Sequence, residues 1–148
     1  EYLDRGVFIW CRSSNTLSGL QDVRVGSGCG PRLFEWLAAQ VSGWDKYGNV
    51  GLIAGATYPV DIETIRSICP EMPLLVPGVG AQEGDLGRSV AAGVDHSGRR
   101  LVVSSSRGVL YASRSPEGFD LAVRTAAKKI RDRINDTLSS EGKGWSKI

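Results

Sequence analysis

Four short apolar runs alternate with longer amphipathic stretches along this chain. Each run is continuously apolar over most of its length rather than alternating, which is typical of parallel strands that are buried on both faces. Turn-forming glycines and polar residues follow each run. The pattern therefore predicts four buried strands, with the sequences GVFIWC (6–11), NVGLIAGA (49–56), PLLVPG (73–78) and RLVVSSS (100–106).

Helical patterns fill the intervals, at residues 31–41, 60–69, 85–92 and 119–138. The first two begin at or just after a proline, which suits the first turn of a helix. Strand followed by helix, four times over, predicts an α/β fold of parallel units joined by right-handed crossovers. Such a sheet is either open and doubly wound or part of a closed barrel, and in both cases ligands bind at the carboxyl ends of the strands.

The last predicted strand and helix are joined by RSPEG (114–118), and the chain closes with EGKGWSKI (141–148). Both stretches are rich in glycine and polar residues. We expect a loop at the first and a loosely ordered end at the second.

Composition narrows the class of protein further. The chain has 148 residues, 41% of them hydrophobic, which suits one domain with a core of its own. Eighteen Lys and Arg against sixteen Asp and Glu give a net charge of +2, and the basic residues are scattered except near 128–133. This balance favours neither a nucleic-acid surface nor a membrane surface. We find no apolar run of about 18 residues and no signal-peptide pattern, so neither a membrane span nor export is predicted.

The cysteines indicate a reducing compartment. Cys11, Cys29 and Cys69 are odd in number, widely spaced and not arranged as C-x-x-C. Neither a disulfide framework nor a metal site is therefore predicted.

The glycine loop after the third run is a candidate anion site. Gly78, Gly80 and Gly84 are spaced one residue too long for a dinucleotide fingerprint, and Asp95 follows too soon to be a ribose-binding acid. The backbone N–H groups could still approach a phosphate, and Gln82 would add an amide donor. Taken alone, the loop could equally be a plain turn.

The fourth run changes that balance. Arg107 follows it directly, after three serines and before Gly108, so a fork of guanidinium donors lies beside hydroxyls and flexible backbone. A lone arginine is usually a solvated charge or an ion-pair partner. Two consecutive loops with the same chemistry favour a phosphate site, and in (β/α) barrels such a site frequently lies after the last two strands.

The first run ends in CRSSN, whose Ser13, Ser14 and Asn15 could read the polar edge of a ring, although a simple turn explains them as well. Cys11 is interpreted as a buried strand residue rather than a nucleophile. The single histidine, His96, lies in a turn-like DHSG and is expected at the surface.

These segments together resemble a known family. LLVPGVGAQEGDLG, followed after a short helix by LVVSSSRGVLYAS, is similar to the end of orotidine 5'-phosphate decarboxylase, in the bacterial subgroup with a serine-rich final strand. GVFIWCRSSN, NVGLIAGATYP and the closing IRDRIN also resemble that subgroup, so the likeness covers nearly the whole chain.

The resemblance implies a TIM (β/α) barrel, of which residues 1–148 would form the C-terminal half with about four βα units. It implies a carboxy-lyase that converts orotidine 5'-phosphate to uridine 5'-phosphate without a cofactor, in the last step of pyrimidine nucleotide synthesis. It also implies a cytoplasmic homodimer.

Roles for individual residues follow from the resemblance. Gln82 and Arg107 would hold the 5'-phosphate, helped by backbone N–H groups near Ser106 and Gly108. Ser14 would meet the pyrimidine ring. A mobile loop over 77–84 would close on the nucleotide, with Pro77, Gly78, Val79 and Gly80 at its start.

The family's catalytic centre is an acid-x-Lys-x-x-acid network whose lysine protonates the carbanion left when carbon dioxide departs. No such run occurs in this chain, and Lys46 in WDKYGN lacks the second acid. We therefore assign no catalytic residue to residues 1–148, expect the half with the catalytic lysine to be missing, and expect this segment alone to be inactive.

Three positions depart from the subgroup. Glu83 replaces a usual glycine, Ser104 a usual asparagine, and Thr16 a usual proline. An acid beside a phosphate loop is unfavourable unless it points away. Two alternatives therefore stay open: a non-catalytic phosphate-binding half barrel, and another phosphosugar enzyme of the same barrel class.

Overall fold

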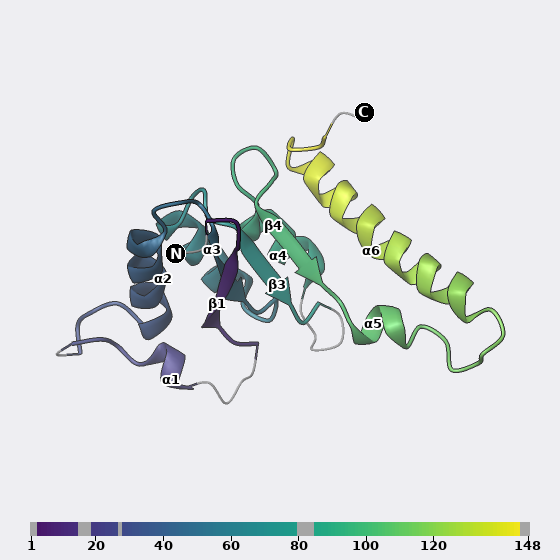
Figure 1. Cartoon of the computed structure of the whole chain (residues 1–148), viewed down its shortest axis with the longest axis horizontal. Helices are drawn as coiled ribbons and strands as arrows, with labels where there is room; N and C mark the ends of the chain where they lie inside the picture. The colour runs from purple at the N-terminus through teal and green to yellow at the C-terminus, as the bar shows by residue number, and fades with distance from the viewer. Residues whose placement is uncertain (1–2, 15–18, 27, 80–84, 146–148) are drawn as a thin grey trace.

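The computed structural model describes residues 3–14, 19–26, 28–79 and 85–145. Its centre is one sheet of four strands in the order β1-β2-β3-β4 (Figure 1). Every neighbouring pair is parallel, so the carboxyl ends of all four strands meet at one edge. The strands are β1 (Val7–Arg12), β2 (Val50–Ala54), β3 (Leu74–Pro77) and β4 (Leu101–Ser104).

The predicted helices are confirmed to within a few residues. They are α2 (Leu33–Trp44), α3 (Pro59–Ile68), α4 (Leu86–Gly93) and α6 (Phe119–Ser140). Two single-turn helices were not predicted, α1 (Gly19–Asp22) and α5 (Arg107–Leu110). Four residues are too few to show a helical period, so the sequence pattern carries no signal for them.

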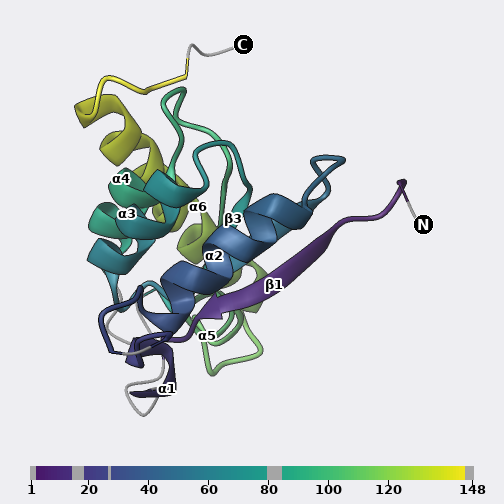
Figure 2. The ribbon, with the colours of Figure 1, turned by 90° about the vertical axis from the view of Figure 1, so that its left-hand side faces the viewer.

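The core lies between the sheet and the helices that connect its strands. Figure 2 shows α2, α3 and α4 close together, and α2 packs on α3 as α3 packs on α4. The sheet contributes alternate residues such as Leu52 and Leu74, and the helices contribute Phe34, Ile62 and Val90, all fully buried. Period-two alternation thus places one face of each strand against the helices.

The opposite face of the sheet differs from the prediction of strands buried on both faces. Phe8, Trp10 and Val102 are 41%, 53% and 52% exposed. Strand register aligns Trp10, Ile53, Leu75 and Val102 in one row across this face. Four strands do not close on themselves, so the residues that would fill a barrel interior are left uncovered. We call this surface the open face.

A buried arginine connects α3 to the segments that lead into the amino-terminal ends of β3 and β4. Arg66 in α3 donates hydrogen bonds to three carbonyls in the turn at 69–72 and to the carbonyls of Gly93 and Arg100, at 2.6 to 3.0 Å. These carbonyls come from the segments that precede β3 and β4. Arg66 therefore fixes α3 and the end of α4 relative to the starts of two strands.

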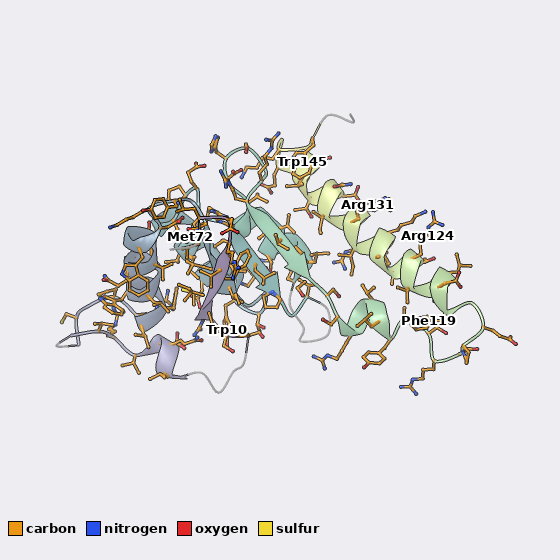
Figure 3. The ribbon with its side chains drawn as sticks, viewed as in Figure 1. Trp10, Met72, Phe119, Arg124, Arg131 and Trp145 are labelled. Carbon is orange, nitrogen blue, oxygen red and sulfur yellow. The ribbon has the colours of Figure 1, made fainter. Side chains whose placement is uncertain are left out.

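The longest helix, α6, lies beside β4, at the far side of the sheet from α2 (Figure 1). Ile130, Ile134 and Leu138 pack toward the core. The chain end is better anchored than predicted as far as Trp145, whose indole N–H donates to the Gly98 carbonyl at 3.2 Å. Phe119, Arg124 and Arg131 are labelled along α6 in Figure 3.

Candidate functional site

A cavity of about 190 Å³ opens at the carboxyl ends of the strands. Its wall comes from the end of β1, the loop after β3 and the start of α5. Its position therefore agrees with the general location of ligands in parallel α/β folds. The lining residues are Trp10, Ser14, Pro77, Gly78, Val79, Ser104, Ser105, Ser106 and Arg107.

The structure brings together most of the described residues that the sequence singled out. Residues from three loops, Ser14, 77–79, Ser106 and Arg107, share the same cavity although 93 residues separate the first from the last. Gly108 does not line it and follows Arg107 in α5. Gly80, Gln82 and Glu83, as well as Asn15 and Thr16, lie outside the described residues.

Arg107 is exposed at the start of α5. Among the described residues, no carboxylate lies within ion-pair distance of its guanidinium. The backbone of the short helix is held by hydrogen bonds from the Leu110 and Tyr111 N–H groups to the carbonyls of Ser106 and Arg107, at 2.8 and 3.2 Å. The guanidinium is thus available to an anion in the cavity while its backbone is fixed.

The loop after β3 presents backbone to the same cavity. Gly78 has φ of 89°, a conformation that residues with a side chain rarely adopt. Together with Pro77 and Val79 it forms the wall facing the serines that end β4. A ligand can approach this wall closely because glycine has no Cβ.

The end of β1 is clamped by charged side chains that the sequence analysis did not identify. Arg12 is 3% exposed, and its Nε donates to Asp61 at 2.8 Å while its terminal nitrogens lie 3.2 Å from Asp22. Its guanidinium also stacks over the Tyr58 ring at 4.2 Å. A charge at the end of a buried strand must be paired. An arginine at the end of an apolar run was therefore the available sequence signal for a partner carboxylate. The ion pairs of Arg12 fix the backbone just before Ser14.

Trp10 is a second residue that the sequence analysis missed. It lines the cavity from the open face and is labelled on β1 in Figure 3. The sequence signal was the alternation of Phe8 and Trp10 on one face of a strand, which the continuous apolar run concealed. Its half-exposed ring gives the cavity one aromatic wall.

Cys11 is buried and His96 lies at the surface, as the sequence predicted for each. Burial raises the pKa of the Cys11 thiol to about 12, and its Sγ–H donates to the Phe34 carbonyl at 3.2 Å. His96 is 81% exposed. Lys46 and His96 both lie in segments before the start of a strand, at the end of the sheet opposite the cavity. A buried, protonated thiol is a poor nucleophile.

Within the described ranges we find no group of three or more His, Cys, Asp or Glu side chains that could hold a metal ion. The helices described here also include none that is long and apolar enough to cross a membrane.

The chain is similar in sequence to curated proteins that all carry the same name. It is 47% identical over 133 residues to the orotidine 5'-phosphate decarboxylase of Thermomicrobium roseum, and 48% identical over 137 residues to that of Paracidovorax citrulli. These matches cover 88% and 90% of the chain but 47% and 49% of the relatives. The chain thus spans about half the length of the curated relatives it matches. No family model matches it.

Solved structures agree. A Leishmania donovani UMP synthase superposes with a TM-score of 0.80 at 38% identity, over 92% of this chain and 28% of that one. A Leishmania donovani OMP decarboxylase gives 0.71 at 32% identity, over 90% and 50%. The resemblance inferred from the sequence and the half-barrel fold are both confirmed.

Proposed function

We propose, from the premise that this chain is a relative of the orotidine 5'-phosphate decarboxylases over nearly all of its length, that it forms the nucleotide-binding half of such an enzyme. The enzyme would convert orotidine 5'-phosphate to uridine 5'-phosphate. The observation that carries the proposal is the shared cavity, which unites Ser14, the loop after β3 and Arg107.

The phosphate would lie at the end of the cavity formed by the serines and Arg107. An arginine fork can make two charge-assisted hydrogen bonds to a phosphate, and such bonds are among the strongest in proteins. Hydroxyls of Ser105 and Ser106 can donate to the remaining oxygens. Gln82 and the Gly108 N–H would donate further hydrogen bonds to the phosphate. Both roles remain predictions.

The pyrimidine would lie toward Ser14 and Trp10. A serine hydroxyl can donate to or accept from a polar ring edge, and the exposed indole face of Trp10 can pack on a planar ring. The loop at 77–79 lines the same cavity. The two binding chemistries thus match the two ends of a nucleotide.

The chemistry itself needs a proton donor that we do not assign within this chain. When carbon dioxide leaves the ring, the electron pair stays on the ring carbon and takes up a proton. This chain's residues would bind and orient the nucleotide, so that phosphate binding energy favours the transition state at the distant carboxylate. The acid-x-Lys-x-x-acid network would come from the half that the relatives have in addition.

The resemblance also supports a cytoplasmic homodimer. Cys11, Cys29 and Cys69 are all free thiols in the structure, as in a reducing compartment. The chain's small net charge of +2 supports no nucleic-acid or membrane partner.

The phosphate role of Arg107 can be tested in a chimaeric enzyme, which joins the full chain to the half of the Thermomicrobium roseum enzyme that it does not match. Loss of the guanidinium removes a charge-assisted contact of at least about 1.5 kcal/mol. Arg107→Ala should therefore lower kcat/KM for orotidine 5'-phosphate by about tenfold or more.

The matched control is Arg124→Ala, which removes an exposed arginine on α6 that does not line the cavity. It should leave kcat/KM within about twofold of the unsubstituted chimaera. Equal effects of the two substitutions would refute the phosphate role of Arg107.

A further inference from the structure

The turn after β2 contacts Ser14, the residue that the proposed function assigns to the pyrimidine. We call residues 55–57, with the sequence Gly-Ala-Thr, the GAT turn. The Gly55 N–H donates to the Arg12 carbonyl at 2.8 Å. The Thr57 hydroxyl donates to the Ser14 carbonyl at 3.3 Å. The GAT turn therefore extends the pairing of β2 with the end of β1 and reaches Ser14 itself.

Gly55 is also in close contact with the backbone of Ser14. A Cβ at Gly55 would lie 2.5 Å from the Ser14 nitrogen and 2.7 Å from its Cα. Real Cβ contacts do not occur at such distances, so any larger residue at this position must displace Ser14 or the turn. The missing side chain thus permits the observed position of Ser14.

On its other side the GAT turn is attached to the loop that would face the phosphate. The Ala56 N–H donates to the Pro77 carbonyl at 2.9 Å, where β3 ends. The Ala56 carbonyl in turn accepts a hydrogen bond from the fully buried hydroxyl of Ser89 in α4 at 3.1 Å. One turn is therefore bonded to two residues that line the cavity from different segments, Ser14 and Pro77.

None of the three residues of the GAT turn lines the cavity. We propose that the GAT turn is a positioning element, which sets Ser14 at a fixed place relative to the loop at 77–79 and so matches the cavity to a ring and a phosphate on one nucleotide. This inference rests on the proposed function. It predicts that damage to the turn weakens recognition of the pyrimidine more than recognition of the phosphate.

Two ligands separate these effects in the chimaeric enzyme that contains the full chain. Uridine 5'-phosphate carries both groups, whereas ribose 5-phosphate lacks the ring. Gly55→Ala should weaken binding of uridine 5'-phosphate by about tenfold, the scale of one lost polar contact to the ring. It should leave the Kd for ribose 5-phosphate within about twofold. The control is Gly43→Ala in α2, where an added Cβ meets nothing within 4 Å.

Thr57 provides a second variant that adds no bulk. Thr57→Val removes the hydroxyl that reaches Ser14 and should show the same selective loss, whereas Thr57→Ser retains the hydroxyl and should bind like the unsubstituted enzyme. Thr64→Val is the matched control, because the Thr64 hydroxyl makes a similar bond to the Val60 carbonyl on an exposed part of α3.

The outcomes are distinct. Selective loss of uridine 5'-phosphate in Gly55→Ala and Thr57→Val, with rescue by Thr57→Ser, supports the inference. Equal loss of both ligands, or loss of neither, overturns it, because the turn would then serve the fold alone. If the unsubstituted chimaera bound uridine 5'-phosphate no better than ribose 5-phosphate, the proposed function would fail first and the inference with it.

Discussion

Arg107 and Ser14 line one cavity because each lies within three residues of the end of a strand, and parallel strands bring their carboxyl ends together at one edge. Arg12 also lies at that edge, but its partners could not be identified from the sequence. Asp22 and Asp61 lie 10 and 49 residues away from it, and no local pattern links a charge at a strand end to one carboxylate among many. Residue-level contacts of this kind need the fold first.

The cysteines give a prediction at this scale. Cys29 is exposed, whereas Cys11 and Cys69 are buried. A thiol reagent at pH 8 should therefore modify Cys29 alone in the folded chain and all three residues in urea, as mass spectrometry of the labelled peptides would show. Rapid native labelling of Cys11 would contradict the burial described here.

Stability should respond to alkaline pH through Cys11. Burial raises the pKa of this thiol from 9.0 to about 12, so the unfolded state ionises first. The contribution of Cys11 to the free energy of unfolding is complete below pH 9 and is lost as pH rises toward 12. Cys11→Ala should therefore show a shallower alkaline loss of stability than the unsubstituted chain, measured by urea unfolding at several pH values.

At the scale of elements, all four strands and the four long helices were predictable from periodicity and flanking prolines and glycines. The hydrogen bonds of the GAT turn were not, because they join it to the segments ending β1 and β3 and to α4 and leave no periodic trace. The anchoring of Trp145 on Gly98 was also missed, since the glycines and lysines around it are typical of a loose end.

Arg66 offers the sharpest prediction for the elements. Its guanidinium satisfies carbonyls before β3 and β4 in a buried environment. Arg66→Met would leave those acceptors unsatisfied, at about 1–3 kcal/mol for each that water does not reach. We expect the free energy of unfolding in urea to fall by at least about 3 kcal/mol.

Arg124→Met on the exposed face of α6 is the control and should change the free energy of unfolding by less than about 0.5 kcal/mol. A loss for Arg66→Met no larger than that of this control would show that the carbonyls find other partners.

For the whole molecule, the open face is the feature that bears most directly on the proposed function. Trp10 and Val102 are more than half exposed on a sheet surface that a closed barrel fills with side chains. The continuous apolar runs predicted burial on both faces because the sequence is suited to a closed barrel. The described chain covers only one face, and it also spans about half of its relatives. Both facts support the proposal that this chain supplies one half of a two-part site.

The central claim is that this chain is a competent nucleotide-binding half of a decarboxylase. The most direct test is the decarboxylation of orotidine 5'-phosphate by the chimaera of the full chain with the unmatched half of the Thermomicrobium roseum enzyme. We predict turnover that depends on Arg107. A folded chimaera that binds uridine 5'-phosphate without turning over orotidine 5'-phosphate would contradict the claim and would favour a non-catalytic binding protein.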